Sequence, residues 1–298
     1  MPNNRPPRLL FVINPKSGVK GKISCEENIR DYFSKTGHQL EFYELNGAGD
    51  ANDLQNHIAK FQPDRVIAVG GDGTIKFLAG QLINTNMALG ILPAGSANGL
   101  AKELNIPLQI EQALEVIDKG IEKKIDVIQI DENNISIHLS DMGLNALLIK
   151  YFEQQDRRGM WGYAKVMFRV FRTKRLMRIE ADINGEKILR AAYMIVIANA
   201  RCYGTGASIN PQGEVSDGKF EVVIVRRLKL FELIKMLVSH MPFKAENIEV
   251  LSTEQVTIST RRMNHFQVDG EYMGKKNKIR AKILPSSLTI VLPGGNIK

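Results

Sequence analysis

Three glycine-rich segments, each placed just after a short apolar run, carry the residue types that bind phosphate groups. They are residues 14–18 (Asn-Pro-Lys-Ser-Gly), 70–74 (Gly-Gly-Asp-Gly-Thr) and 92–101 (Leu-Pro-Ala-Gly-Ser-Ala-Asn-Gly-Leu-Ala). Glycine lets the backbone approach a phosphate closely, and the N–H groups of a helix N-terminus attract anions. Because the carboxyl ends of parallel strands share one edge of a sheet, we expect the three segments to converge into a nucleotide site there.

Asp72 stands out because a carboxylate is unexpected beside a bare phosphate. It fits if a divalent cation or a nucleotide hydroxyl belongs to the ligand; alternatively the segment is a tight strand-to-helix turn with Asp72 as its N-cap. Ser96 is a second expected helix cap. The spacing of a P-loop, the G-x-G-x-x-G dinucleotide fingerprint, the G-x-S-x-G elbow and metal-ligand spacings of His and Cys are all absent from the sequence.

Two further turns carry carboxylates. Residues 266–271 end a strand with Asp269-Gly270-Glu271, where a carboxylate could accept the proton of an attacking hydroxyl; alternatively this is a hairpin turn. Asp217, in the turn at 215–219, is either a ligand of a structural cation or an ordinary turn residue.

The order of the expected elements divides the chain in two. The first part alternates strands (9–13, 39–45, 65–69, 87–92) with helices (23–35, 51–61, 75–82, 97–104, 110–118). In the second part, strands follow one another (124–130, 135–139, 179–183, 188–198, 220–225, 249–251, 256–259, 266–268, 279–284, 288–291), with helices at 144–155, 161–171 and 230–239. The fold class is therefore α/β with two domains: a parallel α/β sheet at 1–122 and an antiparallel β-rich sandwich at 123–298.

The net charge of the protein has a defined location. The chain carries 40 Lys and Arg against 32 Asp and Glu, a formal net charge of +8. The segment Arg157–Arg178 holds eight Lys or Arg and no acidic residue, so it accounts for the whole surplus. Such a localised patch argues against nucleic acid as a partner and favours peripheral contact with an anionic membrane surface, or one acidic ligand.

Bulk composition narrows the class further. With 298 residues and a 44% hydrophobic content, the chain is long and apolar enough for a large core. The two cysteines, Cys25 and Cys202, suit a reducing compartment, and no apolar run reaches the length of a membrane span. We expect a cytoplasmic protein that associates with membranes peripherally; a homodimer is compatible with the sequence.

Taken together, the motifs resemble those of the diacylglycerol kinase catalytic-domain family. The segments 14–18, 70–74, 89–104 and 268–271 occur in that family's order and spacing, and the likeness covers nearly the whole chain. The family contains soluble bacterial lipid kinases and the sphingosine and ceramide kinases. The resemblance implies ATP bound in a cleft between the two domains, and Mg²⁺ as a second cofactor.

The resemblance also assigns residues. Asp269 matches the general base, with Glu271 and Asp72 as further catalytic candidates, and Asp217 matches a structural Mg²⁺ ligand. Asp126 resembles an inter-domain aspartate of a charge network that reaches Asp72. The residues that match nucleotide-contacting motifs are Asn14, Pro15, Lys16, Ser17, Gly18, Gly70, Gly71, Asp72, Gly73, Thr74, Gly95, Ser96 and Asn98.

Three positions depart from the family pattern. Lys76 and Phe77 stand where Asn and Glu are usual, and Gly99 stands where bacterial diacylglycerol kinases have an acidic residue. The expected activity is an ATP-dependent transfer of phosphate to the primary hydroxyl of a membrane lipid such as diacylglycerol. Alternatives are a sphingoid-base kinase, a small-molecule kinase resembling NAD kinase, or a catalytically silent relative that binds lipid or nucleotide.

Overall fold

The structure is a computed structural model that describes residues 6–15, 17, 22–47, 49–153, 170, 172, 175–201, 209–210, 213–227 and 245–294. It divides into two compact units. Unit 1 comprises Met1–Ile125 and Ser286–Lys298, and unit 2 comprises Asp126–Pro285. Lys16, Gly18, Cys202, the helix expected at 230–239, and most of the helix at 161–171 and of the cationic segment 157–178 lie outside the described residues.

Unit 1 contains the parallel sheet that the sequence predicts. The strands are β1 (Arg8–Ile13), β2 (Gln39–Glu44), β3 (Arg65–Gly70) and β4 (Ala88–Pro93), in the spatial order β2-β1-β3-β4. Every neighbouring pair in this order is parallel. Strands β1 and β3 are buried along most of their length, which is typical of a sheet covered on both faces.

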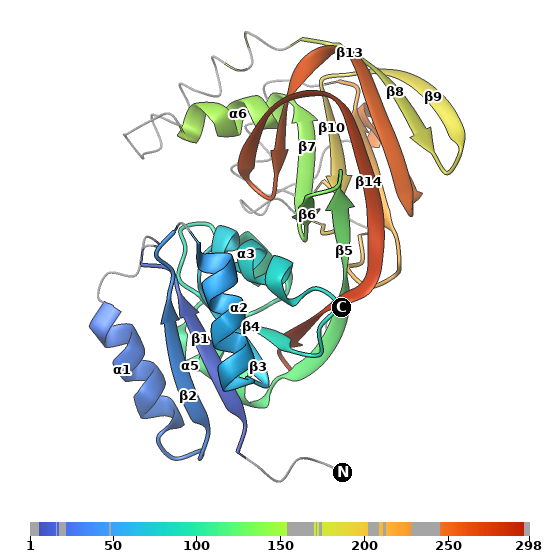
Figure 1. Ribbon diagram of the computed structural model, residues 1–298. Coiled ribbons are helices and arrows are strands. Elements are labelled where there is room, and N and C mark those ends of the chain that lie inside the picture. Colours follow the sequence, from blue (N-terminus) through green and yellow to red (C-terminus); the bar gives the residue numbers. More distant parts are fainter. Residues whose placement is uncertain are drawn as a thin grey trace. The chain divides into compact units, whose positions relative to one another are not determined.

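The helices of unit 1 lie on both faces of this sheet. Helices α1 (Lys22–Phe33) and α5 (Ile110–Lys119) pack on one face, where Phe11, Ile29 and Leu114 share a cluster. Helices α2 (Asp50–Phe61) and α3 (Asp72–Leu82) cover the other face (Figure 1), and the short α4 (Gly99–Glu103) precedes α5. Strands β1 and β3 are neighbours whose following helices lie on opposite faces, and open α/β sheets bind ligands at the carboxyl edge of such a position.

Unit 2 is built almost entirely of antiparallel strands. They are β6 (Asn134–Ser136), β7 (Leu139–Gly143), β8 (Met177–Ile183), β9 (Glu186–Ala192), β10 (Met194–Ala198), β11 (Phe220–Val225), β12 (Ile248–Thr253), β13 (Gln255–Val268) and most of β14 (Glu271–Leu292). Strand β5 (Ile121–Ile130) enters from unit 1, and α6 (Leu144–Glu153) and a 3₁₀ turn (Ala245–Asn247) complete the described elements.

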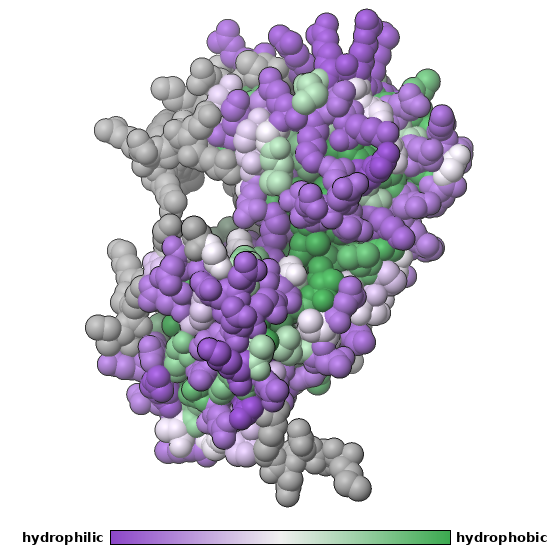
Figure 2. Space-filling view, viewed as in Figure 1, coloured by the Kyte–Doolittle hydropathy of each residue, from purple (hydrophilic) through white to green (hydrophobic). Residues whose placement is uncertain are grey.

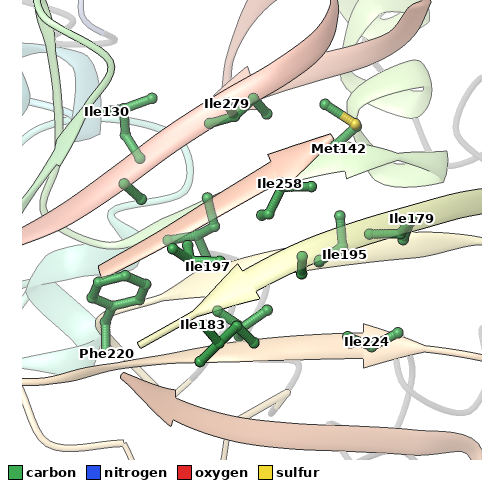
Figure 3. Packing of buried hydrophobic residues seen from close by; sticks show 14 of the residues in the cluster. Ile130, Met142, Ile179, Ile183, Ile195, Ile197, Phe220, Ile224, Ile258 and Ile279 are labelled. Atoms are coloured by element: carbon green, nitrogen blue, oxygen red, sulfur yellow. The ribbon is translucent and has the colours of Figure 1, made fainter. Parts of the chain in front are cut away.

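Strand β13 belongs to two layers. Its first half pairs with β8 and its second half with β7, and two register shifts lie between them. The row β12-β11-β10-β7 continues from the second half. Buried side chains from both layers face one another: Figure 3 shows Ile179, Ile195, Phe220 and Ile258 among them. The predicted β-rich sandwich is therefore present.

Some strand boundaries differ from the expected ones. The runs at 135–139 and 188–198 are each split into two strands, whereas four runs near the C-terminus merge into β13 and β14. The two runs in β13 merge because the ladder between β13 and β14 continues through the register shifts. The end of β14 also departs from expectation: we placed all of 123–298 in the second domain, but residues 286–298 group with unit 1, where Thr289 pairs with Ala88 of β4.

Across the part of the chain that the structure describes, no helix is both long and apolar enough to span a membrane.

Candidate active site

The three glycine-rich segments meet at the carboxyl edge of the unit 1 sheet. Asn14, after β1, donates from Nδ2 to Thr74 Oγ1 over 3.0 Å, and its own N–H donates to Val69 O over 3.1 Å. The amide of Ala94, after β4, donates to Gly70 O over 2.8 Å. The predicted convergence is confirmed, and hydrogen bonds tie the first segment to the second and the second to the third.

Two glycines allow this closeness. A Cβ on Gly95 would stand 2.5 Å from Gly71 Cα, a distance that real Cβ atoms do not show. A Cβ on Gly71 would likewise lie 3.1 Å from Gly95 Cα. The second and third segments therefore approach backbone to backbone, and larger residues at either position would force them apart.

Asp72 does not cap its own helix. Helix α3 begins at Asp72 with Gly71 as N-cap and without a side-chain cap. The Asp72 carboxylate instead accepts from the first amides of α4, Gly99 N over 2.9 Å and Leu100 N over 3.0 Å. Its charge is thus compensated by the N-terminus of α4. Thr74 N and Ile75 N both donate to Gly71 O, whereas the first two amides of α3, those of Asp72 and Gly73, have no acceptor inside the helix and are available for an anion.

Helix α4 starts two residues later than expected. Its N-cap is Asn98, in the left-handed region with φ 50° and ψ 48°, so the prediction of Ser96 as the cap is wrong. Ser96 is exposed. The Asn98 carboxamide makes a reciprocal pair with Gly95: Oδ1 accepts from Gly95 N over 2.9 Å, and Nδ2 donates to Gly95 O over 2.9 Å. Asn98 therefore shapes the loop, and its buried side chain is committed to it.

The remaining members of the predicted nucleotide set lie in the same loops. Pro15 is half-buried, and Ser17 donates from Oγ to Asn14 O over 2.6 Å, which closes the first turn. Gly73 lies exposed in the first turn of α3, and Gly70 ends β3. Lys16 and Gly18 lie outside the described residues.

In unit 2, Asp269 sits in a two-residue hairpin loop. Val268 pairs with Glu271 on either side of it, and Asp269 and Gly270 have positive φ values of 50° and 87°. The Asp-Gly sequence is favoured in such turns because both residues tolerate the left-handed region. The backbone of residues 268–271 therefore confirms the prediction of a hairpin turn. Glu271, the other catalytic candidate, is exposed at the start of β14.

The Asp269 carboxylate is nevertheless directed to a neighbouring segment rather than to its own turn. Oδ1 accepts from Ser136 Oγ over 2.8 Å, from His138 N over 3.1 Å and from Leu139 N over 3.0 Å. Oδ2 accepts from Ile137 N over 3.0 Å. These four donors hold the Asp269 carboxylate in one orientation.

Sequence reasoning missed the residue that supports this hairpin. Gln267 is buried; its Oε1 accepts from Gly270 N over 2.7 Å, and its Nε2 donates to Asp141 Oδ2 over 2.5 Å. Asp141 is fully buried and also accepts from Ala146 N in the first turn of α6 over 2.9 Å. Gln267 thus connects the Asp269 turn to the start of α6. The signal in the sequence that could have revealed Gln267 and Asp141 is a polar residue inside an otherwise apolar strand.

The turn at 215–219 offers one carboxylate for a metal. Asp217 is exposed and accepts from Lys219 N over 3.0 Å. The buried Asp126 accepts from Gly218 N over 2.6 Å, and among the described residues no group of three His, Cys, Asp or Glu could hold a metal ion. A Mg²⁺ ion at Asp217 would therefore take backbone carbonyls and water as its other ligands, and the assignment of Asp217 stays a prediction.

Glu221 is a second residue that the sequence did not reveal. It lies in β11, buried, and accepts from Asn210 Nδ2 over 2.5 Å and Ser252 Oγ over 3.1 Å. Burial, chiefly, raises the pKa of Glu221 above its ordinary value, and the nearby charge of Asp217 adds to the rise.

The positions that depart from the family pattern occupy ordinary places in the fold. Lys76 and Phe77 are half-buried in α3. Gly99 is the buried first residue of α4, and its amide is one of the two that bind Asp72. An acidic side chain is thus absent beside Asp72, where it would add a second negative charge.

Comparison with known proteins agrees with this organisation. Residues 8–130 match the model of the diacylglycerol kinase catalytic domain, and residues 141–292 match that of the YegS C-terminal NAD kinase beta sandwich-like domain. A Yersinia enterocolitica protein named "Probable lipid kinase YegS-like" is 28% identical over 96% of this chain and 97% of its own. An uncharacterized Synechocystis protein is 29% identical over 96% of this chain and 70% of its own.

Solved structures show the same fold. A diacylglycerol kinase from Bacillus anthracis superposes with a TM-score of 0.74 at 18% identity, over 98% of each chain. Another B. anthracis structure gives a TM-score of 0.79 at 20% identity, over 98% of this chain and 99% of its own. With the two domain models together spanning most of its length, the chain belongs to the kinase family that joins a diacylglycerol kinase catalytic domain to a YegS-type C-terminal domain.

Proposed function

We propose that this protein is an ATP-dependent lipid kinase that phosphorylates the primary hydroxyl of a membrane lipid, with diacylglycerol as the leading substrate. The observation that carries the proposal is the convergence of three glycine-rich turns at one sheet edge, joined by the Asn14–Thr74 bond and the Gly71–Gly95 approach. Family membership and the names of the relatives support the lipid as acceptor.

In this proposal the unit 1 edge binds the ATP phosphates. The amides of Asp72 and Gly73 begin α3 at the carboxyl edge of the sheet. Because Gly71 and Gly73 have no side chains, phosphate oxygens can approach the backbone there. Asp72 does not repel the phosphates strongly, because its carboxylate is compensated by Gly99 N and Leu100 N. Mg²⁺ enters as part of the MgATP substrate and offsets the phosphate charge.

The proposal assigns proton acceptance to Asp269. The lipid hydroxyl oxygen forms a bond to the γ-phosphorus, the bond to the β–γ bridging oxygen breaks, and ADP leaves. The hydroxyl proton passes to Oδ2 of Asp269, which accepts one of the four hydrogen bonds recorded for this carboxylate, whereas Oδ1 accepts three. Held orientation and charge stabilisation supply most of the catalysis in such transfers.

The test is a transfer assay with γ-labelled ATP and Mg²⁺, offered separately diacylglycerol in mixed micelles, sphingosine in mixed micelles, and NAD. We expect label in the phosphorylated diacylglycerol. Label in sphingosine alone redirects the substrate assignment, and label in NAD alone contradicts a lipid kinase. ATP binding with no labelled product in any arm contradicts catalysis.

The variant Asp269→Asn tests the base within the same assay. Turnover should fall at least 100-fold, since general-base catalysis contributes about that much or more, while ATP affinity is retained. Asp182→Asn is the matched control: Asp182 also accepts a backbone amide beside a two-residue hairpin turn, from Gly185 N over 3.1 Å. Near-normal turnover of Asp269→Asn would remove the assignment.

A further inference from the structure

Strand β13 carries a bulge that is held by its own side chains. Residues 260–263 lie between the pairs Ser259↔Lys278 and Asn264↔Lys276, where β14 contributes one residue, Asn277. Thr260 Oγ1 donates to Arg262 O over 2.8 Å, and Asn264 Nδ2 donates to the same oxygen over 2.7 Å. Asn264 Nδ2 also donates to Thr260 Oγ1 over 3.0 Å. The bulge is therefore a built feature with a defined shape.

This bulge presents an unusual group of residues to solvent. Arg261 and Arg262 are exposed, and Met263 is 54% exposed although it is a large apolar residue. The side chains of Thr260 and Asn264 form hydrogen bonds within the bulge, whereas the charged and apolar side chains at 261–263 are exposed to solvent. Neither packing in a core nor the geometry of a turn requires arginine or methionine at these exposed positions.

A second exposed apolar residue leaves the sheet at the same end. Strand β8 pairs with β13 in antiparallel register, with Ile179 opposite Thr260. The chain before Ile179 therefore runs alongside the chain after Thr260. It carries Leu176, which is 55% exposed, and the exposed Arg175. Arg175 is also one of the described residues of the cationic segment 157–178.

The charges at this end are uncompensated. Within the described ranges, the side chains of Arg175, Arg261, Arg262 and Lys278 pair with no carboxylate, in contrast to Lys276, which binds Asp131. The β14 segment 272–284 contains five Lys or Arg and no acidic residue. Figure 2 shows hydrophilic side chains gathered over the β13 end of unit 2, with hydrophobic atoms among them.

We propose that this docking surface (Arg175, Leu176, Arg261, Arg262, Met263 and Lys278) binds anionic phospholipid membranes, with Leu176 and Met263 entering the interface. Basic residues around exposed apolar ones are typical of interfacial binding, since the cations attract anionic headgroups and the apolar groups leave water. A nucleic acid would use the cations but not aliphatic side chains. The role of this surface rests on the proposed function, because a lipid kinase meets its substrate in a membrane.

The test is flotation of the full chain with vesicles of phosphatidylcholine, with and without 30 mol% phosphatidylglycerol, at low and physiological salt. We expect binding to the anionic vesicles and a decrease with salt. Arg261→Glu with Arg262→Glu should weaken it by roughly tenfold or more at low salt. Met263→Ser should weaken it by about threefold, with less dependence on salt.

The matched control reverses two exposed cations of unit 1, Lys35→Glu with Lys60→Glu, which changes the net charge equally. It should bind vesicles nearly as the unaltered protein does. Equal weakening by control and test variants, or wild-type binding by the Arg261/Arg262 variant, would overturn the docking surface. A loss of oligonucleotide binding without a loss of vesicle binding would assign it to nucleic acid instead.

A parallel transfer assay separates this inference from the proposed function. The Arg261/Arg262 variant should keep full activity on short-chain diacylglycerol in detergent and lose it on vesicles. Absence of all kinase activity combined with charge-dependent vesicle binding would reject the proposed function and keep the docking surface.

Discussion

Gly71 and Gly95 belong to different turns, and their backbones touch: a Cβ added to Gly95 would lie 2.5 Å from Gly71 Cα and 2.8 Å from Asn98 Oδ1. Neither glycine has the positive φ for which glycine is usually retained. Glycine is required at both positions for steric reasons, because the loop after β4 packs directly against the loop after β3. The shape of the proposed phosphate site depends on that contact.

Gly95→Ala should therefore weaken ATP binding and destabilise unit 1. The added methyl meets backbone, which cannot rotate away, so we expect a loss of about 2 kcal/mol in the free energy of unfolding. Gly294→Ala is the control, since a Cβ there has no atom within 4 Å. Denaturant titration and ATP-binding calorimetry measure both effects; unchanged ATP affinity in Gly95→Ala would argue against this loop as a phosphate contact.

Asp72→Asn should destabilise the fold even without substrate. An amide can accept only one of the two bonds that Gly99 N and Leu100 N now donate, and the loss of a helix cap costs about 1 kcal/mol. Asp50→Asn is closely matched, because Asp50 accepts from Asn46 N and Gly47 N before α2. Both variants should lose stability, and ATP affinity should fall in Asp72→Asn alone. If the stability of Asp72→Asn equals that of the unaltered protein, the capping role is wrong.

Gln267→Glu should be strongly destabilising in a pH-dependent way. The new carboxyl replaces the amide that donates to Asp141, so two buried carboxyl groups would face each other. We expect a loss of about 3 kcal/mol at neutral pH that shrinks as the solution is acidified and one group takes up a proton. Gln255→Glu, on the exposed start of β13, should change little. Thermal denaturation at several pH values tests this prediction. A loss of stability that does not change with pH would contradict the contact between residues 267 and 141.

Glu221→Gln should become relatively more stable as pH rises. Burial raises the pKa of Glu221 above its ordinary 4.5, so the stability of the protein from this group is complete below about that pH and is lost as pH rises through the raised folded-state pKa. Glutamine does not titrate, so the variant's advantage over the unaltered protein should grow from pH 4.5 to pH 8. A difference in unfolding free energy that stays constant over this range would show that Glu221 is not perturbed.

The alternation of strands and helices was enough to predict the sheet of unit 1 and the meeting of its turns. Buried parallel strands such as β1 and β3 have continuous apolar runs, and their carboxyl ends share an edge by topology alone. What the pattern could not show is the direction of side chains. Asp72 was an evident candidate for its own helix, yet it bonds to α4, because the Gly71–Gly95 contact brings α4 within reach.

In unit 2 the strand content was predictable and the pairing was not. The two pieces of β13 have separate apolar patterns, since the bulge at 260–263 interrupts the alternation without interrupting the strand. Gln267 and Asp141 are polar residues in apolar strands, and the bond between their side chains joins positions 126 residues apart. Such a contact depends on which strands become neighbours, and no local pattern records it.

Because the end of β14 belongs to unit 1, the sheet of unit 1 is completed only after unit 2 has been synthesised. Leu288, Ile290 and Leu292 are buried beside a sheet whose other strands were all made before residue 94. A ribosome therefore completes the whole of unit 2 before the edge of the first sheet can be covered. We infer that the β4 edge of a nascent chain stays unpaired until residues 286–292 have been made, and that a fragment of residues 1–125 would expose that edge to pairing with other chains.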